Sequence, residues 1–198
     1  DHPWNNLVER PIPQWKDYGV KTLATMNGRG VVKAPLPYNA QFTPVIDITD
    51  PVGGTLIRIE TDHVHGGSDN CIRAEYITRK GRQQYESLGW MNGDTLYIRY
   101  PQESSLTVHS VAFRETGYNA EFKGKFHCSD DFVNRFREKA LRTLYVNMRD
   151  TYFDCPDRER AQWWGDVTIL MGESFYQLSP EANMLTRKAI RELVNWQR

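Results

Sequence analysis

One stretch organises this chain: Thr151-Tyr152-Phe153-Asp154-Cys155-Pro156-Asp157-Arg158-Glu159-Arg160-Ala161-Gln162-Trp163-Trp164-Gly165-Asp166. It gathers four carboxylates, two arginines and two adjacent tryptophans with a proline and a glycine, a mixture that neither a plain helix nor a plain strand favours. Pro156 prevents a regular helix and biases Cys155 to an extended conformation, so Asp154 is presented from irregular backbone. Loops held by rigid elements commonly carry catalytic groups, and we interpret this stretch as a site.

Helical periodicity flanks the stretch on both sides. Ser129-Asp130-Asp131 predicts an N-cap with acidic residues in the first turn, and the helix should run to about Asn147. Its apolar face comprises Phe132, Val133, Phe136, Ala140, Leu141 and Leu144. A second helix is expected to begin near Asp166 and to bury Ile169, Leu170 and Phe175.

A third helix is signalled most clearly. Ser179 is expected to cap it and Pro180 to take its first position. An apolar stripe follows, formed by Leu185, Ala189, Ile190, Leu193 and Trp196. This face has no later partner, and no Gly or Pro stops the helix before Arg198, so we expect the chain to be truncated relative to a longer protein. The isolated chain should then fold poorly, because the inner apolar faces of its helices would be exposed.

Upstream of Gly117 the period is that of strands. Seven short β-rich runs are predicted: 20–26, 42–48, 55–60, 72–78, 83–88, 95–100 and 106–113. Turn chemistry separates several of them, at Asp50-Pro51-Val52-Gly53-Gly54, Arg79-Lys80-Gly81-Arg82 and Asn92-Gly93-Asp94. The expected organisation is an irregular lead-in over residues 1–18, an antiparallel jelly-roll-like β-sandwich domain over 19–120, and a helical domain over 121–198.

Composition narrows the functional classes. Lys plus Arg and Asp plus Glu are 25 each, so no basic excess exists to bind nucleic acid or an anionic membrane surface. No window approaches the length of an apolar membrane span, and the protein is expected to be soluble. Aromatic residues make up 12%, which suits either the stacking of sugar rings or ordinary core packing. The three cysteines show neither a metal knuckle nor a disulfide framework, and they do not settle the compartment.

The acidic loop has a definite chemical use. Arg158 and Arg160 can hold carboxylates as forks, and tryptophan walls would desolvate a neighbouring acid. A carboxylic acid kept protonated beside ionised neighbours is what a glycosidase needs as its general acid. The alternative is an inter-helix loop tied by salt bridges, and charge alone leaves the two interpretations open.

Other candidates are weaker. His63-Val64-His65, with Asp62 and Asp69 nearby, could bind a metal, but histidines at this spacing beside a Gly-rich turn are more often ordinary loop residues. Gly28-Arg29-Gly30 and Gly53-Gly54 lack the strand-to-helix context of a phosphate loop and are interpreted as turns. No nucleophile is predicted, since Ser174 has no elbow setting and Cys155 is better explained as a buried loop residue.

The run from Asp154 to Asp166, Asp-Cys-Pro-x-Arg-Glu-Arg-x-x-Trp-x-Gly-Asp, resembles the signature of bacterial α-L-rhamnosidases, glycoside hydrolase family 78. The resemblance extends upstream through Phe113-Arg114-Glu115-Thr116-Gly117-Tyr118, Phe126-His127-Cys128-Ser129-Asp130 and Asn147-Met148-Arg149-Asp150-Thr151. It covers roughly residues 83–180, whereas the earlier strands are similar only in texture. The long motif is specific, and chance explains it poorly.

The resemblance implies a β-sandwich followed by an (α/α)6 toroid, and release of terminal α-L-rhamnose from glycosides or polysaccharides with inversion. Glu159 is expected to be the general acid. Asp154, Arg158 and Asp166 are expected to bind sugar hydroxyls, with Trp163 lining the pocket. No cofactor and no catalytic metal are implied; a divalent ion could have a structural role in such proteins, but nothing in the sequence locates one. A secreted or periplasmic location is slightly favoured over a cytoplasmic one.

The chain departs from the family pattern in one respect. An inverting site needs a second carboxylate, roughly 6.5–9.5 Å from the acid, to activate water. In the family this base is a Glu far downstream, and no residue here matches it. Glu173, Glu181 and Glu192 are interpreted as solvent-facing charges. Two alternatives therefore stay open: a non-catalytic carbohydrate-binding protein, which the chain taken literally fits better, and an (α/α)6 hydrolase acting on another sugar.

Overall fold

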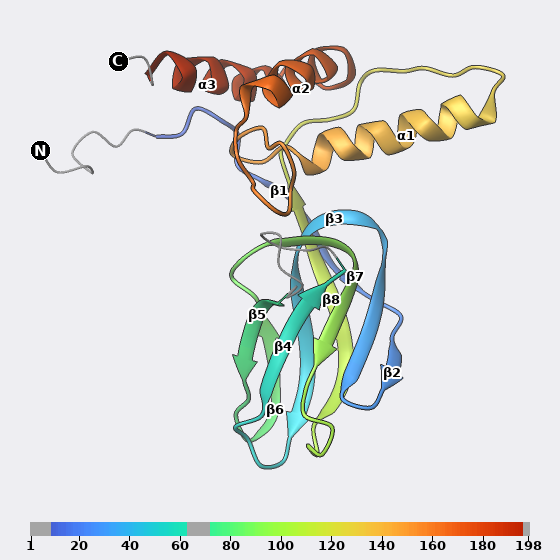
Figure 1. Ribbon diagram of the computed structural model, residues 1–198, viewed down its shortest axis with the longest axis vertical. Coiled ribbons are helices and arrows are strands. Elements are labelled where there is room, and N and C mark those ends of the chain that lie inside the picture. The colour runs from blue at the N-terminus through green and yellow to red at the C-terminus, as the bar shows by residue number, and fades with distance from the viewer. Residues whose placement is uncertain (1–8, 63–71, 196–198) are drawn as a thin grey trace, which may run out of the picture. The chain divides into compact units, whose positions relative to one another are not determined.

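The computed structural model describes residues 9–62 and 72–195 (Figure 1). Contacts divide the chain into two units, each described by itself. The β unit comprises residues 16–117 together with 155–161. The helical unit comprises 118–154 and 162–198 together with the N-terminal segment up to Trp15. The expected order of a β domain followed by helices is confirmed at this level.

Within the described residues, the β unit is an antiparallel sheet of eight strands, and each of the seven predicted runs overlaps at least one of them. The strands are β1 (Lys16–Thr22), β2 (Met26–Gly28), β3 (Val31–Asp50), β4 (Leu56–Thr61), β5 (Ile72–Ile77), β6 (Gly81–Glu86), β7 (Met91–Arg99) and β8 (Thr107–Gly117). They are hydrogen-bonded in the order β1-β8-β3-β7-β4-β5, with β2 and β6 also paired to β3.

The strands are hydrogen-bonded into one curled antiparallel sheet, a sandwich-like arrangement that agrees in part with the predicted jelly-roll-like β-sandwich. The curl of the sheet arises at β3. The 20 residues of this strand pair first with β7 and then with β8, and the pairing with β7 shifts register between Pro35 and Ala40. This bend brings both halves of β3 around a single core. That core is fully buried and contains residues from β3, β4, β7 and β8, among them Val32, Phe42, Ile46, Ile59, Leu96, Ile98 and Val111.

Strands β6 and β7 lie along the same side of β3 as one interrupted line. Glu86 pairs with Val45 and Met91 pairs with Phe42, so only residues 87–90 leave the ladder between them. The break is tied to the sheet, since the Ser87 amide donates to the Pro44 carbonyl over 3.2 Å.

The predicted turn at Asn92-Gly93-Asp94 is wrong, because these residues belong to β7. Gly93 pairs with Ala40, and a Cβ added to Gly93 would lie 2.9 Å from the side chain of Thr61. Position 93 is a glycine because neighbouring strand β4 approaches it too closely for a side chain. The turn at Gly53-Gly54 is confirmed between β3 and β4, where both glycines have positive φ (86° and 84°).

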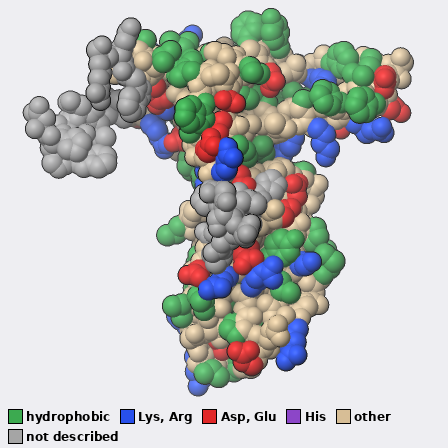
Figure 2. All heavy atoms as spheres, in the orientation of Figure 1, with side chains coloured by type: hydrophobic (Ala, Val, Ile, Leu, Met, Phe, Trp, Pro, Cys, Tyr) green, Lys and Arg blue, Asp and Glu red, His purple; other side chains and the backbone are tan. Residues whose placement is uncertain are grey.

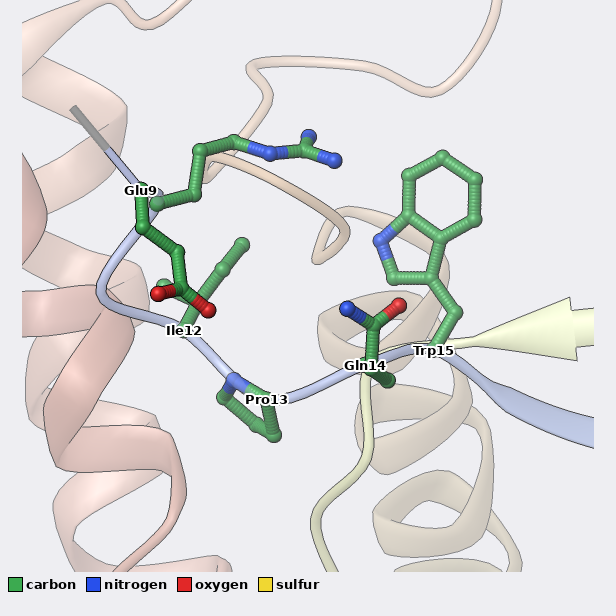
Figure 3. Close-up of a pocket in the computed structure, with 6 residues that line it drawn as sticks. Glu9, Ile12, Pro13, Gln14 and Trp15 are labelled. Atoms are coloured by element: carbon green, nitrogen blue, oxygen red, sulfur yellow. The ribbon is translucent and has the colours of Figure 1, made fainter. Parts of the chain in front are cut away.

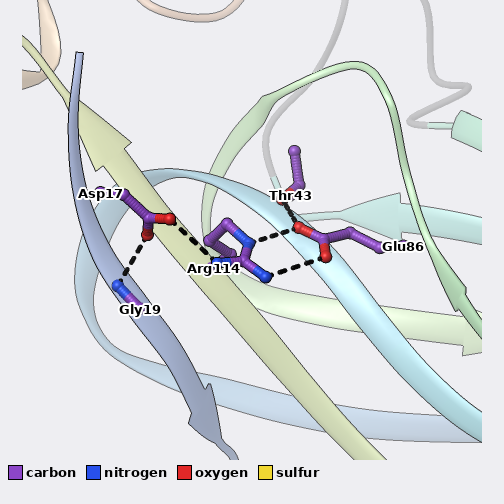
Figure 4. A network of polar contacts seen from close by, with 5 residues as sticks. All are labelled: Asp17, Gly19, Thr43, Glu86 and Arg114. Carbon is purple, nitrogen blue, oxygen red and sulfur yellow. Dashed lines mark hydrogen bonds and ion pairs between the residues drawn. The ribbon is translucent and has the colours of Figure 1, made fainter. Parts of the chain in front are cut away.

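Arg114 on β8 binds acidic side chains of two other strands, β1 and β6 (Figure 4). Its guanidinium binds Glu86 of β6 over 2.7 and 3.3 Å and Asp17 of β1 over 2.9 Å. Thr43 donates to the same Glu86 carboxylate over 2.8 Å. The hydrogen bonds from Arg114 lower the pKa of Glu86, so the fork binds an ionised carboxylate. One arginine of the family-like stretch thus has a structural contact that sequence did not assign.

The helical unit contains α1 (Asp131–Val146), α2 (Trp164–Gln177) and α3 (Ala182–Asn195). The N-cap of α1 is confirmed, since the Asp130 carboxylate accepts from the Phe132 and Val133 amides. Helix α3 begins two residues after Pro180, preceded by a turn in which the Ala182 amide donates to the Ser179 carbonyl. None of the three is long and apolar enough to cross a membrane, nor is any other helix in the described part of the chain.

Tyrosine hydroxyls tie the interior of the helical unit together. Tyr118 donates to the Glu181 carbonyl over 2.6 Å, and Tyr145 donates to the Tyr118 carbonyl over 2.8 Å. Tyr152 donates to Ser174 of α2 over 3.0 Å. Since Tyr118 and Tyr152 are fully buried, these bonds satisfy polar groups that would otherwise be lost from water.

The helices bury only part of the apolar faces that the sequence predicted. Leu144, Leu170, Leu185 and Ala189 are buried, but the expected burial of Ile169 and Phe175 is wrong, since their exposed fractions are 64% and 69%. Other apolar side chains are exposed, among them Phe132, Phe136, Ile190 and Leu193, and Figure 2 shows apolar side chains gathered over α1. Trp196 lies outside the described residues. Nothing among the described residues covers these apolar faces, so Ile169 and Phe175 are exposed where the sequence predicted burial.

Candidate active site

Backbone hydrogen bonds within the helical unit fix the segment at which the candidate loop begins. Beyond α1, the Phe153 amide donates to the Asn147 carbonyl over 2.7 Å, and the Arg149 amide donates to the Thr151 carbonyl over 3.0 Å. Thr151 also hydrogen-bonds Gln162, which closes the two ends of the loop on each other. The stretch is therefore held at its base by backbone and side-chain bonds.

Residues 155–161, the middle of the loop, pack with the β unit. Two local bonds close a tight turn here. The Glu159 amide donates to Sγ of Cys155 over 3.4 Å, and Nε of Arg160 donates to the Pro156 carbonyl over 2.9 Å. The predicted irregular backbone of the loop is thus confirmed. Hydrogen bonds within the loop, from Glu159 to Cys155 and from Arg160 to Pro156, define its conformation.

Arg160 is the point where the turn is fixed to the β unit. Its φ is +51°, the one positive φ at a non-glycine residue in the described part of the chain. Its guanidinium carbon lies 3.7 Å from the ring centroid of Trp90, and both terminal nitrogens lie 3.4 Å from the Trp90 carbonyl oxygen. The strained backbone conformation costs about 1–3 kcal/mol. A cation–π contact at a partly desolvated site contributes about 0.5–2 kcal/mol, so the contact offsets much of that cost.

The five predicted site residues are divided between the units. Glu159 and Arg158 belong to the β unit, where Nη2 of Arg158 pairs with Oε1 of Glu159 and both residues are exposed. Asp154, Trp163 and Asp166 belong to the helical unit. The structure therefore brings the predicted acid and one predicted sugar-binding residue into direct contact.

Two of the three residues in the helical unit, Trp163 and Asp166, lie at the start of α2. Asp154 is half-buried at the end of the anchored segment. Trp163 occupies the N-cap position of α2 without a capping side-chain bond, and 57% of it is exposed. Asp166 is exposed in the first turn, where a carboxylate complements the helix dipole. An exposed tryptophan and an exposed carboxylate therefore lie at the N-terminus of α2.

A depression of about 590 Å³ lies beside the loop within the helical unit. It is lined by Asp150, Thr151, Gln162, Trp164, Lys188, Glu192 and Leu193. Sequence reasoning missed this contribution of α3. Glu192 was expected to face solvent; its side chain is 37% exposed and pairs with Lys188 over 2.5 Å, and Glu173 and Glu181 are exposed as expected. In the sequence, the only signal for this ion pair is the i,i+4 spacing of Lys188 and Glu192 on a helix.

The lead-in packs in the same unit. A smaller cavity of about 210 Å³ is formed there by residues Glu9, Arg10, Ile12, Pro13, Gln14 and Trp15 (Figure 3). The Arg149 guanidinium lies 3.8 Å from the Trp15 ring centroid, and Arg10 binds Asp150 over 3.5 Å. These contacts attach the lead-in directly before Thr151, where the candidate loop begins.

The described residues contain no group of three or more His, Cys, Asp or Glu side chains that could hold a metal ion. His63, His65 and Asp69 lie outside the described residues. Asp62 is described, and its carboxylate accepts from the Asp94 and Thr95 amides over 2.9 and 3.1 Å. That observed contact is an ordinary structural one.

Comparison with known proteins gives the loop its context. Residues 121–198 match the family model of the bacterial alpha-L-rhamnosidase 6 hairpin glycosidase domain. The chain resembles the bacterial α-L-rhamnosidases of glycoside hydrolase family 78. The matched residues contain the whole candidate loop, so the rhamnosidase motif lies within the segment that the family model recognises.

Solved rhamnosidases share the fold. The α-L-rhamnosidase from Dictyoglumus thermophilum superposes with a TM-score of 0.76 at 18% identity, over 94% of this chain and 22% of that chain. The Streptomyces avermitilis α-L-rhamnosidase, complexed with L-rhamnose, gives 0.76 at 17% identity, over 97% and 20%. The Bacillus sp. GL1 family 78 rhamnosidase gives 0.66 at 24% identity, over 76% and 17%. The chain thus spans about a fifth of the length of these three proteins, and no curated protein sequence matches it.

Proposed function

We propose that the chain is part of a glycosidase that hydrolyses terminal α-L-rhamnose from glycosides or polysaccharides with inversion. The observation that carries the proposal is the position of the rhamnosidase-like motif. It forms a loop with accessible carboxylates, an arginine and a tryptophan, inside the residues matched by the six-hairpin glycosidase family. Acid-assisted departure of the aglycone requires this kind of group and no cofactor.

Glu159 is the general acid in this proposal. It has the accessibility that the role demands, since its side chain is 37% exposed and its amide is bonded within the turn. Its present partner is Arg158. A protonated acid has to donate to the glycosidic oxygen, so substrate binding would exchange the Arg158 contact for sugar hydroxyls.

The other three residues would bind the sugar. Asp154 and Asp166 offer carboxylates that accept from ring hydroxyls, and Trp163 offers an apolar face to the C–H side of the ring. This pattern agrees with the exposure of Trp163 and Asp166. The proposed partner is a neutral sugar on a larger glycoside, and the balanced charge offers no basic excess for nucleic acid or an anionic membrane surface.

The general base is assigned to a segment beyond residue 198, on further hairpins of an (α/α)6 toroid. Three observations support this assignment: the chain spans about a fifth of the length of three solved relatives, the matched family is a six-hairpin domain, and apolar faces of α1, α2 and α3 are exposed. We expect the 198-residue chain alone to be inactive for this reason. We also propose a secreted or periplasmic location.

The test uses the full-length protein with an alkyl α-L-rhamnoside, whose leaving group needs protonation, and with p-nitrophenyl α-L-rhamnoside, whose leaving group needs little. Glu159→Gln should lower kcat on the alkyl rhamnoside by about 10²–10⁴-fold and on the p-nitrophenyl rhamnoside much less. Glu173→Gln, at an exposed glutamate of α2, is the matched control and should leave both rates unchanged.

Other outcomes separate the alternatives. Equal activity of Glu159→Gln and wild type on the alkyl substrate would refute the acid assignment. A wild-type protein that binds L-rhamnose without cleaving either substrate would be a carbohydrate-binding protein. Activity on another glycoside in place of rhamnosides would keep the toroid and change the sugar. The anomer released first, followed by NMR, tests inversion.

A further inference from the structure

We propose that Trp90, a residue of the β unit, is a positioning residue for the general acid: through Arg160 it fixes the turn that carries Glu159. The inference rests on the proposed function, which assigns the acid to Glu159. It extends that function by giving the β unit a part in catalysis. The rhamnosidase-like motif itself does not include Trp90, which lies 70 residues before Arg160.

The first step is the contact between Arg160 and Trp90. The guanidinium carbon lies 3.7 Å from the indole centroid, within the range for strong cation–π contact, and the same guanidinium approaches the Trp90 carbonyl oxygen with both terminal nitrogens at 3.4 Å. Arg160 thus binds both the ring and the backbone of one residue. Two attachments to one partner define the orientation of the guanidinium plane.

The second step is the turn itself. While its terminal nitrogens face Trp90, Nε of Arg160 donates to the Pro156 carbonyl, four residues earlier. Arg160 also has a positive φ, which non-glycine residues adopt only when the surroundings enforce it. The Glu159 amide bonds Cys155 across the same turn. Glu159 is therefore the last residue of a turn that is closed by its own amide on one side and by Arg160 on the other.

The third step is the rigidity of the platform. Trp90 belongs to the short break between β6 and β7, and both strands pair with β3 on either side of that break. Met91, the next residue, is buried and paired with Phe42. A side chain that leaves a sheet between two paired strands has little backbone freedom, which makes Trp90 a fixed reference for the turn.

The consequence concerns the position of the Glu159 carboxyl. A general acid has to lie within hydrogen-bond reach of the leaving oxygen, and a misplacement of about 1 Å can lower a rate by about 10²-fold. Loss of the Trp90 contact would free the turn without touching the acid. The loss of this contact should slow the step in which the leaving group is protonated, and it should leave the affinity for the sugar largely unchanged.

The experiment compares Trp90→Ala with wild type in the full-length protein, using the alkyl and the p-nitrophenyl α-L-rhamnosides. Trp90→Ala should lower kcat on the alkyl substrate by about 10- to 100-fold, lower kcat on the p-nitrophenyl substrate by less than about threefold, and change KM by less than about threefold. Trp90→Phe, which keeps an aromatic face, should recover much of the lost rate. A merely structural role would lower both rates equally and would not depend on the leaving group.

Two further variants complete the test. Tyr97→Ala removes another aromatic of the same sheet with cationic neighbours, at 5.4 Å from Arg99 and 5.6 Å from Lys33, and it should leave both rates unchanged. If Trp90→Ala fails to fold by circular dichroism, Arg160→Lys carries the test, because it keeps the charge and loses the Nε bond to Pro156. It should show the same dependence on the leaving group.

The outcomes distinguish this inference from the proposed function. Equal losses on both substrates, or no loss, in a folded Trp90→Ala or Arg160→Lys protein would overturn the positioning role while Glu159→Gln still shows acid dependence. Inactive wild type, or Glu159→Gln without dependence on the leaving group, would instead overturn the assignment of Glu159 on which the inference rests.

Discussion

The β unit and the helical unit of this chain bury their apolar side chains to very different extents. In the β unit Phe42, Ile46 and Leu96 are completely buried, because one curled sheet surrounds its own core. In the helical unit Phe136 and Phe175 are 63% and 69% exposed. A sheet that curls can close a core alone, whereas helices packed on one side leave their other faces uncovered. The helical unit thus buries residues such as Leu144 and Leu185 but leaves other apolar faces of its helices exposed.

The two units also differ in their ionisable groups. Several carboxylates of the β unit, including Asp47, Asp50 and Glu86, have lowered pKa values because side-chain and backbone donors bind the ionised form. In the helical unit burial raises the pKa of Tyr118 and Tyr152. Acid should therefore weaken mainly the β unit, although hydrogen bonds also lower the carboxyl pKa of Glu181 in the helical unit, and alkali should weaken the helical unit.

The largest effect is expected from truncating the core of the β unit. Phe42→Ala should lower the free energy of unfolding of the 198-residue chain by about 3–5 kcal/mol, since it deletes a fully buried ring in edge-to-face contact with Phe113. Phe136→Ala, at an exposed position of α1, should change it by less than about 0.5 kcal/mol. Urea unfolding followed by circular dichroism measures both values.

The same pair of variants sharpens the comparison in the full-length protein. If further hairpins cover α1 there, the effect of Phe136→Ala should rise above about 1 kcal/mol while that of Phe42→Ala stays unchanged. Similar values for Phe136→Ala in both proteins would mean that this face stays exposed, and the proposed toroid would lose its support from α1.

Acid sensitivity of the β unit is the next expected effect. Hydrogen bonds from Thr55 and Thr78 and from the Gly53 amide hold the pKa of Asp50 well below its usual range. The unfolded chain has a carboxyl pKa of about 3.9, so this stabilisation is fully present above about pH 4 and is lost as pH falls toward the folded pKa. Asp50→Asn should lower stability at neutral pH and flatten its decline in acid.

The matched control is Glu103→Gln, which removes one negative charge at an exposed position. It should leave the acid dependence of urea unfolding unchanged. An equal flattening by both variants would show that net charge, and not the bonds at Asp50, governs the acid response.

Local chemistry explains what the sequence could predict. The start of α1 follows from Asp130, whose carboxylate binds the Phe132 and Val133 amides two and three residues away. The strands of the β unit were predicted where apolar residues alternate, as in β4, where Ile57 and Ile59 point inward. The candidate loop was predicted because its motif is contiguous.

Long-range pairing explains what the sequence could not predict. The first half of β3 contains Pro35 and Pro37, which argue against a strand until the bend and its register shift are known. Gly93 lies in a turn-like triplet, and only the approach of β4 shows why glycine stands there. At the site, Trp90 carries no local signal, since its role depends on a contact with Arg160 across 70 residues.

The smallest effect is expected from alkali acting on the helical unit. Burial raises the pKa of Tyr118 above the value of about 10 for an unfolded tyrosine, so its neutral form stabilises the fold below about pH 10 and this contribution is lost as pH rises through the folded pKa. Tyr118→Phe removes the 2.6 Å bond to the Glu181 carbonyl and should lower stability at neutral pH by about 1 kcal/mol, while making unfolding less dependent on alkaline pH. Tyr176→Phe, at a 74% exposed position, is the control and should change neither. If Tyr118→Phe left the alkaline decline unchanged, the difference between the units at high pH would have to arise from Tyr152 or from outside the tyrosines.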